Sequence, residues 1–503
     1  MAKSIMIQGT MSNAGKSLIA AGLCRIFKQD GYKVAPFKSQ NMALNSYVTK
    51  EGLEMGRAQV VQAMAAGVEP SVRMNPILLK PTTDMGSQVI VQGQVVGNMR
   101  AMDYFAKKKE YIPVIRESYE QLAAKHDIIV IEGAGSPAEI NLKQDDIVNM
   151  GMAKIADAPV LLVGDIDRGG VFAQLIGTVM LLEPEEQDRI KGLIVNKFRG
   201  DKKILDPGIA MLEERAGKPV LGVVPYADVD IEDEDSLASS LTETHIQAEI
   251  DVAVIRFPRI SNFTDMQALS MERDVSVRYV TKPSDLGVPD VILLPGTKNT
   301  IQDLLWLRES GLEAKITRLA KKGVIVFGIC GGYQMLGEVL MDPMQTESAL
   351  GSVRGMGLLP VTTMFEEEKQ LENRTYHISM PEGTFASLGG KKVAGYEIHM
   401  GRTEAADNDG VLQPFVIGPD GEVLGYAAGT VAGSYIHGIF DEVAFRETFI
   451  NLLYARKGKT RGESEHLSIH EYREQQFDKL ARILRESLDM NRIYEILELH
   501  RLR

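Results

Sequence analysis

Short apolar runs alternate with helical patterns along roughly the first 225 residues of this chain of 503. The runs are rich in β-branched residues and have no polar face, which indicates strands buried on both sides. Strands joined in this way by helices form a parallel sheet with helices on both faces. We therefore predict a doubly wound α/β fold. The expected strands cover 4–8, 33–37, 127–132, 159–164, 192–196 and 220–224, and the expected helices include 16–29 and 102–125.

A second alternation begins at residue 251 and predicts a further α/β domain. Strands are expected at 251–255, at 290–294 and up to Cys330, with a helix at 300–321. The stretches 351–363 and 421–428 are more typical of antiparallel strands. The chain is thus predicted to contain a first domain (1–227), an acidic linker (228–250), a second domain (251–445) and a C-terminal helical extension (446–503).

The linker and the extension each have two interpretations. Six carboxylates within 228–235 favour a solvated linker over a metal site, because their spacing matches no metal-binding pattern. The apolar residues near the C-terminus recur at helical spacing. We expect this helix to pack on its own domain, with binding of a partner as the alternative.

Composition narrows the class of protein. The net charge of −12 argues against nucleic acid or an anionic membrane as the main partner. No apolar run reaches the ~20 residues that would span a bilayer, and the N-terminus lacks the apolar core of a signal peptide. The two cysteines, Cys24 and Cys330, are too few for a disulfide framework, so we expect a cytoplasmic location. Cys24 lies on an apolar helix face and is expected to pack in a core.

A glycine-rich loop, GTMSNAGKS from Gly9 to Ser17, lies between the first strand and the first helix. Backbone N–H groups in such a loop converge on phosphate oxygens, and the helix dipole adds a favourable potential. Lys16 would neutralise the β- and γ-phosphates, and the Ser17 hydroxyl would bind Mg²⁺. Gly9 and Gly15 are six residues apart, one more than in the usual pattern, but the position in the fold still predicts a phosphate-binding loop.

Two later strands end in polar residues at the edge where parallel sheets bind ligands. Glu132 begins the sequence EGAG and would hold Mg²⁺ directly or through water; the alternative is a turn with an incidental acid. The sequence GDIDRGG at 164–170 would present carboxylates and a cation to phosphate or substrate. Asn196 would contact the adenine, with a plain loop role as the alternative. The predicted nucleotide site comprises Gly9, Thr10, Gly15, Lys16, Ser17 and Asn196, with Ser17 and Glu132 as Mg²⁺ ligands.

A second strand-to-helix turn contains a cysteine. The sequence GICGG, from Gly328 to Gly332, follows the apolar run 324–327 and precedes a helical pattern. Such a turn lifts its central side chain out of the packed layers, and the flanking glycines leave room for the turn and for a substrate. The helix N-terminus behind the sulfur favours the thiolate. Cys330 is therefore predicted to be a nucleophile.

A base for this cysteine is available in SYIHGIF, at 434–440. His437 would take the thiol proton and later protonate a leaving ammonia. A single histidine at a strand end is more often structural, so this prediction depends on its pairing with Cys330. The backbone N–H groups of Gly296 and Gly331 would form an oxyanion hole. Such a site would suit hydrolysis of a glutamine side-chain amide through a thioester.

The cysteine turn, the Leu-Pro-Gly turn that ends at Gly296 and the later histidine resemble a class I glutamine amidotransferase domain. That family commonly has glutamate two residues after the histidine, where this chain has Ile439. The cobyrinate and cobyrate synthases of the CobB/CobQ family share this departure, with cysteine and histidine as their recognised pair. The group that orients His437 is left open. The loop at 9–17 and the EGAG segment resemble the ATP domains of dethiobiotin synthetase type.

The combination of the two domains resembles the CobB/CobQ family over nearly all of residues 1–445. More specific similarity lies in 36–42, 75–81, 164–170, 196–201 and 395–401. The resemblance implies an ATP-binding synthetase domain followed by a glutamine amidotransferase domain. It also implies amidation of the b, d, e and g carboxylates of adenosylcobyrinic acid a,c-diamide to adenosylcobyric acid. The co-substrates would be ATP and glutamine, with Mg²⁺, and the carboxylates would be activated as acyl phosphates.

Three alternatives remain. The nearest is a cobyrinic acid a,c-diamide synthase, which uses the same chemistry on other carboxylates. The second is a P-loop switch of the partition-protein type, and the third is a protease or amidase with a regulatory nucleotide domain. Because the corrinoid is a polyanion and the chain is acidic, we also predict a local basic rim. Its candidate members are Lys38, Arg57, Lys80, Arg100 and Arg168.

Overall fold

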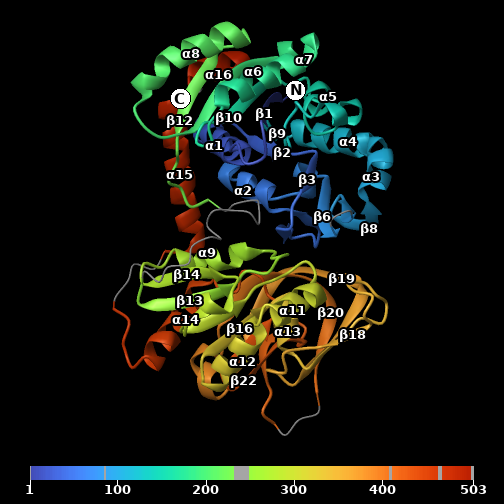
Figure 1. Ribbon diagram of the computed structural model, residues 1–503, viewed down its shortest axis with the longest axis vertical. Coiled ribbons are helices and arrows are strands. Elements are labelled where there is room, and N and C mark those ends of the chain that lie inside the picture. Colours follow the sequence, from blue (N-terminus) through green and yellow to red (C-terminus); the bar gives the residue numbers. More distant parts are fainter. Residues whose placement is uncertain (1, 84–85, 232–247, 407–409, 463–466, 500–503) are drawn as a thin grey trace. The chain divides into compact units, whose positions relative to one another are not determined.

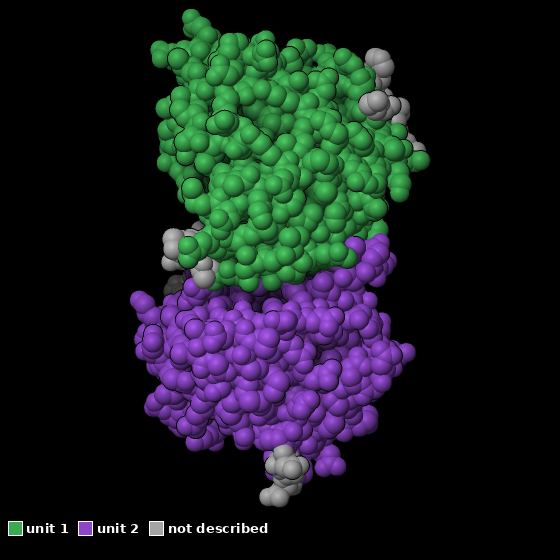
Figure 2. Space-filling view, turned by 90° about the vertical axis from the view of Figure 1, so that its right-hand side faces the viewer, with its two compact units in different colours: residues 1–43, 54–232, 472–503 green, residues 44–53, 233–471 purple. Residues whose placement is uncertain are grey.

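The computed structural model describes residues 2–83, 86–231, 248–406, 410–462 and 467–499. The chain forms two compact units that are not continuous in sequence (Figure 2). Unit 1 contains residues 1–43, 54–232 and 472–503, and unit 2 contains residues 44–53 and 233–471. The predicted domain boundaries stay predictions, and the expected acidic linker lies mostly at 232–247, outside the described residues.

Unit 1 is built on a six-stranded sheet in the order β12-β11-β10-β1-β9-β2 (Figure 1). All neighbouring strands run parallel, as in the pairs Met6↔Val160 and Met6↔Ile131. The predicted α/β fold class and each of the six predicted strands are confirmed. The strands are β1 (Lys3–Gly9), β2 (Val34–Phe37), β9 (Ile128–Glu132), β10 (Val160–Asp165), β11 (Ile190–Phe198) and β12 (Val220–Pro225).

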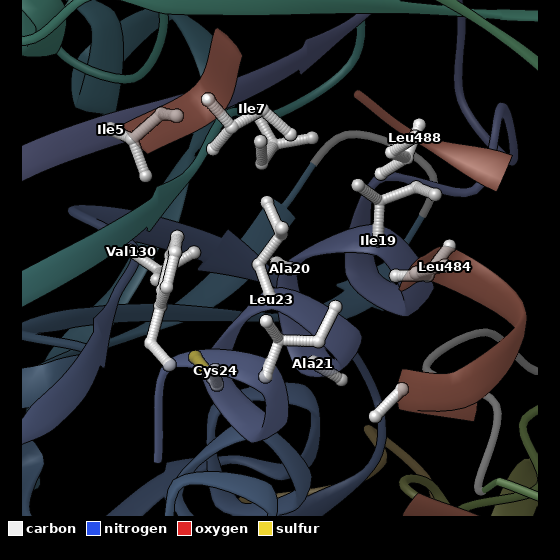
Figure 3. Close-up of a cluster of buried hydrophobic side chains, with 14 of the residues drawn as sticks. Ile5, Ile7, Ile19, Ala20, Ala21, Leu23, Cys24, Val130, Leu484 and Leu488 are labelled. Atoms are coloured by element: carbon white, nitrogen blue, oxygen red, sulfur yellow. The ribbon is translucent and has the colours of Figure 1, made fainter. Parts of the chain in front are cut away.

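Helices cover both faces of this sheet. On one face, alternate strand residues such as Ile5, Ile7 and Val130 form a buried core with the helices α1, α2, α15 and α16 (Figure 3). On the other face lie α4, α5 and α6. The helices are α1 (Lys16–Gln29), α2 (Arg57–Ala66), α4 (Ile112–Ala123), α5 (Met150–Ile155), α6 (Val171–Leu181), α15 (Ile469–Ser487) and α16 (Met490–Ile496).

The helix α15, near the C-terminus, packs on α1 within unit 1 (Figure 3). Gly22 permits this close approach, because a Cβ atom at that position would lie 2.3 Å from Cδ1 of Leu484. Leu480 and Leu484 are completely buried there. Cys24 is also completely buried in the same cluster, which confirms the expectation that it packs in a core. Burial raises the pKa of the Cys24 thiol, so this sulfur stays protonated.

Two predicted helices are divided in the structure. The helix expected at 102–125 consists of α3 (Ala101–Lys107), a 3-10 turn (Lys108–Tyr111) and α4, with Pro113 in the first turn of α4. Proline lacks the N–H group that a continuous helix would need there. The helix expected at 300–321 consists of α11 (Thr300–Glu309) and α12 (Leu312–Lys321). Gly311 separates them with φ 79°, a left-handed conformation that ends a helix.

A smaller sheet in unit 1 was not predicted. Its strands are ordered β3-β6-β7-β8; β3 and β6 are parallel, and β7 runs antiparallel to both β6 and β8. The strands are β3 (Gln40–Met42), β6 (Ile77–Thr83), β7 (Gly86–Val91) and β8 (Gln94–Arg100).

Unit 2 contains a mixed sheet whose first half is parallel, in the order β14-β13-β15-β16-β23. The rest of this sheet is mostly antiparallel, as predicted for 421–428. The parallel strands are β13 (Ile250–Ile255), β14 (Val275–Val280), β15 (Val291–Leu294), β16 (Ile325–Ile329) and β23 (Val431–Ser434). The other strands are β17 (Val339–Met341), β18 (Ser352–Arg354), β19 (Val361–Ile378), β20 (Lys392–Ala405), β21 (Gln413–Ile417) and β22 (Val423–Ala428).

Among the described residues, no helix combines the length and the apolar character that crossing a bilayer requires. The longest helix, α15, carries charged residues throughout its sequence.

Candidate active sites

Cys330 lies at the turn between β16 and the short helix α13 (Gly331–Leu336). Its backbone has φ 51° and ψ −112°, an unusual conformation for a residue with a side chain, which costs about 1–3 kcal/mol. The glycines around it are required for space. A Cβ atom at Gly328 would lie 2.7 Å from the backbone N of Tyr333, and one at Gly332 would lie 2.0 Å from the carbonyl oxygen of Leu294. The sharp turn expected from the sequence is therefore present.

His437 is brought to Cys330 by the register of the sheet. Strands β16 and β23 run parallel, with Ile329 opposite Ser434, so the residues that follow both strands emerge at the same edge. The Cys330 sulfur lies close enough to His437 to raise the pKa of the imidazole. The two groups are 7% and 1% exposed. The sulfur also lies 3.7 Å from the carbonyl oxygen of Ile398.

Asp265 holds the opposite side of the imidazole. Its Oδ2 lies 2.7 Å from Nδ1 of His437, and its Oδ1 accepts a hydrogen bond from the backbone N–H of Gly438 at 2.9 Å. The acid lies in the 3-10 turn η5 (Phe263–Met266) and is 2% exposed. These two bonds fix the ring orientation, a role for which Ile439 has no suitable side chain. Asp265 lies 172 residues before His437 and belongs to no recognisable motif, so the sequence alone does not reveal it.

The charges in this cluster favour the protonated imidazole. Burial alone lowers the pKa of His437, but the Asp265 carboxylate and the Cys330 sulfur outweigh burial and raise the pKa to about 10. At neutral pH the ring therefore carries a proton beside the sulfur. A protonated imidazole in this position has a proton ready for a leaving group.

The two predicted oxyanion-hole residues also lie at this cluster. A Cβ atom at Gly296, just after β15, would lie 3.0 Å from Cε1 of His437. A Cβ atom at Gly331 would lie 3.3 Å from the backbone N of Thr297. The turn after β15 and the start of α13 therefore enclose the cysteine and the histidine. Their role as hydrogen-bond donors to an oxyanion stays a prediction.

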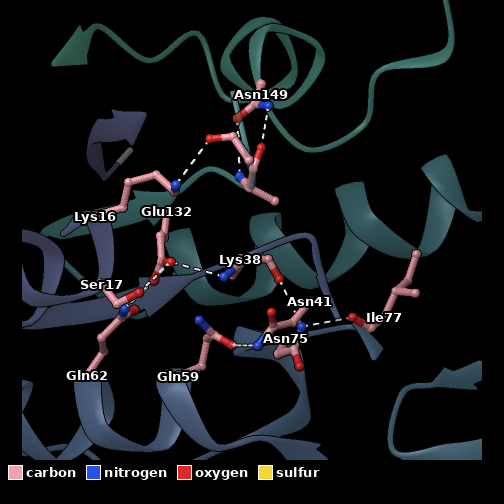
Figure 4. Close-up of polar contacts among 12 residues, drawn as sticks. Lys16, Ser17, Lys38, Asn41, Gln59, Gln62, Asn75, Ile77, Glu132 and Asn149 are labelled. Carbon is pink, nitrogen blue, oxygen red and sulfur yellow. Dashed lines mark hydrogen bonds and ion pairs between the residues drawn. The ribbon is translucent and has the colours of Figure 1, made fainter. Parts of the chain in front are cut away.

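The phosphate-binding loop predicted in unit 1 has the expected local form (Figure 4). Gly15 adopts φ 97°, and a Cβ atom there would lie 2.1 Å from Nδ2 of Asn196. The Lys16 amino group donates to the carbonyl oxygens of Met11 and Gly135, at 2.9 and 3.1 Å. Thr10 donates from its hydroxyl to Gln174 at 3.1 Å. Lys16 is thus held over the loop, as binding of phosphates there requires.

Two residues near the end of β11, Asn196 and Lys197, contact the loop. Nδ2 of Asn196 donates to the carbonyl oxygen of Ala14 at 2.9 Å, so Asn196 helps to hold the loop, and its contact with adenine stays a prediction. The amino group of Lys197 donates to the carbonyl oxygen of Asn13 and to Oδ2 of Asp165. Asp165 ends β10, and its side chain is completely buried. Through Lys197 it anchors the loop, and it does not point to solvent.

Glu132 ends β9 and lies beside the loop (Figure 4). Its Oε1 accepts hydrogen bonds from the Ser17 hydroxyl at 2.8 Å and from the Lys38 amino group at 2.9 Å, and its Oε2 accepts one from Gln62. Adjacent ligands of an octahedral Mg²⁺ at about 2.1 Å lie about 3 Å apart. The Ser17 and Glu132 oxygens therefore fit one ion. The described residues contain no group of three or more His, Cys, Asp or Glu placed for a metal, so phosphate and water would supply the other ligands.

The predicted basic rim is wrong for three of its five members. Lys38, Arg57 and Lys80 are 4–5% exposed. The amino group of Lys38 binds Glu132, and that of Lys80 binds a buried glutamate at 2.9 Å. Buried cations of this kind require an anionic partner, and such a pair is not free to attract substrate at the surface. Arg100 and Arg168 are exposed.

Comparison with known proteins identifies the family. A model described as the CobQ/CobB/MinD/ParA nucleotide binding domain matches residues 5–237, and one described as a CobB/CobQ-like glutamine amidotransferase domain matches residues 251–445. A cobyric acid synthase from Lachnoclostridium phytofermentans is 57% identical over 512 residues, covering 99% of each chain. The chain belongs to the cobyric acid synthase family.

Two further cobyric acid synthases are similar to this chain along nearly their full length. Those from Ruminiclostridium cellulolyticum and Clostridium acetobutylicum are 55% and 53% identical, covering 99% and 98% of this chain and 98% of each relative. A crystal structure of a glutamine amidotransferase is 15% identical and covers 40% of this chain and 98% of its own, but its TM-score of 0.31 is too low to support a conclusion. Membership of the cobyric acid synthase family confirms the resemblance seen in the sequence. The protein is an enzyme with a P-loop nucleotide-binding domain and a glutamine amidotransferase domain.

Proposed function

We propose that this protein amidates the b, d, e and g carboxylates of adenosylcobyrinic acid a,c-diamide, giving adenosylcobyric acid, at the expense of ATP and glutamine. Family membership supports cobyric acid synthase activity, which is a glutamine-dependent amidation in cobalamin biosynthesis. The observation that carries the mechanism is the cluster formed by Cys330, His437 and Asp265. It offers a nucleophile, a proton donor and an acid that orients the donor.

The first half of the proposed reaction releases ammonia from glutamine. The Cys330 thiolate attacks the side-chain amide carbon, and the backbone N–H groups of Gly296 and Gly331 stabilise the resulting oxyanion. The carbon–nitrogen bond then breaks while His437 donates its proton to the departing nitrogen, leaving a thioester. The neutral imidazole next takes a proton from water. The hydroxide attacks the thioester, the carbon–sulfur bond breaks, and glutamate leaves with the thiolate restored.

The second half uses the phosphate-binding loop. A carboxylate is a poor electrophile, so its oxygen first attacks the γ-phosphorus of ATP and ADP leaves. Lys16 and the loop N–H groups offset the charge that develops on the phosphates. Ser17 and Glu132 would hold a magnesium ion that neutralises further phosphate charge. Ammonia then attacks the acyl phosphate, and inorganic phosphate leaves.

The assignment of residues follows from these steps. We assign catalysis of glutamine hydrolysis to Cys330 and His437. The synthetase domain corresponds to 1–227 and the amidotransferase domain to 251–445, joined by 228–250 and followed by the extension 446–503. Nucleotide binding is assigned to Gly9, Thr10, Gly15, Lys16, Ser17 and Asn196.

Because ammonia attacks only when it is unprotonated, we infer a route between the two reactions that excludes water.

The test is the mass of the corrinoid product. Conversion of a carboxylic acid into an amide replaces OH by NH₂ and lowers the mass by about one dalton. With the corrinoid diamide, glutamine and Mg-ATP, the expected product has lost this mass four times. An unchanged diamide, together with twofold amidation of cobyrinic acid itself, would overturn the proposal in favour of an a,c-diamide synthase. Hydrolysis of a peptide-like amide without ATP, with no amidated corrinoid formed, would favour a protease or amidase.

A further inference from the structure

Residues 44–53, which we call the inserted segment, belong to unit 2 although the chain on both sides of them belongs to unit 1. They also lie inside the 5–237 range that matches the nucleotide-binding family model. The segment contains the strand β4 (Ser46–Val48). Asn45 and Ser46 are 1% exposed, and Val48 is completely buried. This part of the segment is therefore an interior part of unit 2.

The inserted segment forms a reciprocal pair of hydrogen bonds with Asn262. Oδ1 of Asn45 accepts from the backbone N–H of Asn262 at 2.7 Å, and Oδ1 of Asn262 accepts from the backbone N–H of Ser46 at 3.1 Å. Asn262 has φ 52° and ψ 37°, a left-handed conformation that is uncommon for a residue with a side chain. The two bonds hold the residue in that conformation.

Asn262 begins the turn that presents the orienting acid. Its carbonyl oxygen accepts a hydrogen bond from the backbone N–H of Asp265 at 3.1 Å, and it lies at the N-cap of η5. Asp265 then reaches Nδ1 of His437 at 2.7 Å. A continuous series of hydrogen bonds therefore leads from Asn45 through Asn262 and Asp265 to the imidazole.

A second path leads to the face of the same ring. The Tyr396 ring lies on the His437 ring, with centroids 5.3 Å apart and planes inclined by 21°. The main chains of these two residues exchange hydrogen bonds of 3.1 and 2.9 Å. Tyr47 packs its ring edge against Tyr396 at 5.2 Å, and the Tyr396 hydroxyl donates to the carbonyl oxygen of Ser46 at 3.4 Å. Val48 forms a buried cluster with Tyr396.

We propose that the inserted segment is a positioning element of the glutaminase site, with Asn45 as its main positioning residue. It fixes His437 from two directions, through Asp265 at the edge of the ring and through Tyr396 at its face. The segment contacts Asn262 and Tyr396, which in turn support Asp265 and His437, so it acts through these residues and not on the reacting atoms. The inference rests on the glutaminase activity proposed above.

The test replaces Asn45 by alanine in the full-length enzyme. Asn45→Ala removes the oxygen that accepts from the Asn262 N–H and loosens the turn that holds Asp265. We expect kcat for glutamine hydrolysis to fall about 10-fold or more while KM for glutamine changes less than about threefold. ATP-dependent amidation with high ammonium, which bypasses the glutaminase, should stay within about twofold of wild type. Asn451→Ala, at an exposed position of α14 (Val443–Arg456), is the matched control and should leave kcat unchanged.

A double-mutant cycle separates positioning from general weakening of the fold. If Asn45 acts through Asp265, Asn45→Ala should lower kcat less than about threefold when Asp265 is already asparagine. Unchanged glutaminase in Asn45→Ala, or the full loss repeated in the Asp265→Asn background, would overturn the proposal. If Asn45→Ala does not fold, Asn45→Leu serves in its place, because leucine has a similar size and lacks the oxygen that accepts from the Asn262 N–H. Retained kcat in Asn45→Leu would then contradict the proposal.

Ammonium-dependent amidation distinguishes this inference from the proposed function. If wild type forms no amide from ammonium and ATP, the proposed synthetase reaction is wrong. If wild type does so and Asn45→Ala keeps full glutaminase activity, only the positioning role is wrong.

Discussion

The phosphate-binding loop and the glutaminase site are assembled in contrasting ways. The loop consists of nine consecutive residues, Gly9 to Ser17, and the helix that follows them fixes their geometry. The glutaminase cluster brings together Asp265, Cys330 and His437, which span 172 residues. The first site is local, and the second depends on strand register across a sheet. A sequence motif can therefore reveal the loop but not the whole glutaminase cluster. Because the two sites share no residue, we predict that each can be disabled without the other.

The largest effect is expected at Cys330, where a substitution should disable the glutaminase site and spare the phosphate-binding loop. Cys330→Ala should lower glutamine-dependent amidation by at least about 10⁴-fold, since no other group replaces the nucleophile. Amidation with high ammonium should persist, and product mass measures both. Cys24→Ala is the matched control, because that sulfur is buried in a hydrophobic core, and it should keep both activities. Loss of the ammonium-dependent reaction in Cys330→Ala would contradict the separation of the sites.

A substitution in the phosphate-binding loop should have the opposite effect, lowering amidation and sparing glutamine hydrolysis. Lys16→Ala should lower ATP-dependent amidation from either nitrogen source by about 10²–10³-fold, because phosphate charge is no longer offset. Glutamine hydrolysis, measured as glutamate release, should change less than about fivefold. Lys202→Ala, at the exposed start of α8 (Lys202–Ala216), is the control and should behave as wild type. Full amidation by Lys16→Ala would show that the loop does not bind the reacting phosphates.

A substitution at Asp265 tests the one member of the glutaminase cluster that belongs to no sequence motif. Asp265→Asn should lower kcat for glutamine hydrolysis by about 10²–10⁴-fold, because the ring loses its orienting carboxylate. Asp420→Asn, which changes a side chain that is 75% exposed, should have no effect. An active Asp265→Asn enzyme would mean that the cysteine and histidine need no third group.

The pH dependence gives a further readout of the same acid. Burial lowers the pKa of His437, but Asp265 and Cys330 raise it to about 10, so the alkaline limit of wild-type glutamine hydrolysis should lie near pH 10. Asp265→Asn should move that limit to lower pH. The contribution of the imidazolium to folding stability is fully present below about pH 6.5 and is lost as pH rises through about 10, because the folded-state pKa is the higher one. An alkaline limit that does not move would contradict this account.

The smallest effect on activity is expected at α15, because a substitution there should change stability and not the two sites. Leu484→Ala opens a cavity between α15 and α1 and should lower the free energy of unfolding by about 2–5 kcal/mol, seen as an earlier urea midpoint. Ile204→Ala, whose side chain is 82% exposed on α8, should change it by less than about 0.5 kcal/mol. Equal midpoints for the two variants would show that α15 does not stabilise unit 1.

The sequence predicts those parts of the molecule whose cause is local. β-branched runs along the chain predict the buried strands, and the glycines around Cys330 predict its sharp turn. The pairing of His437 with Cys330 is predicted from its place at a strand end and from the resemblance, and the parallel register of β16 and β23 gives the physical reason for it. Asp265 is not predicted, since its position depends on a three-dimensional turn. The inserted segment 44–53 is not predicted either, because nothing in its composition indicates that it leaves unit 1.

The central claim is that nitrogen taken from glutamine at Cys330 ends in the corrinoid after activation by ATP. The most direct measurement supplies glutamine labelled with ¹⁵N in its side-chain amide, together with Mg-ATP and the corrinoid diamide, and determines the mass of the product. The account predicts that every newly formed amide carries the label. An unchanged corrinoid, or a product amidated without label, would contradict it.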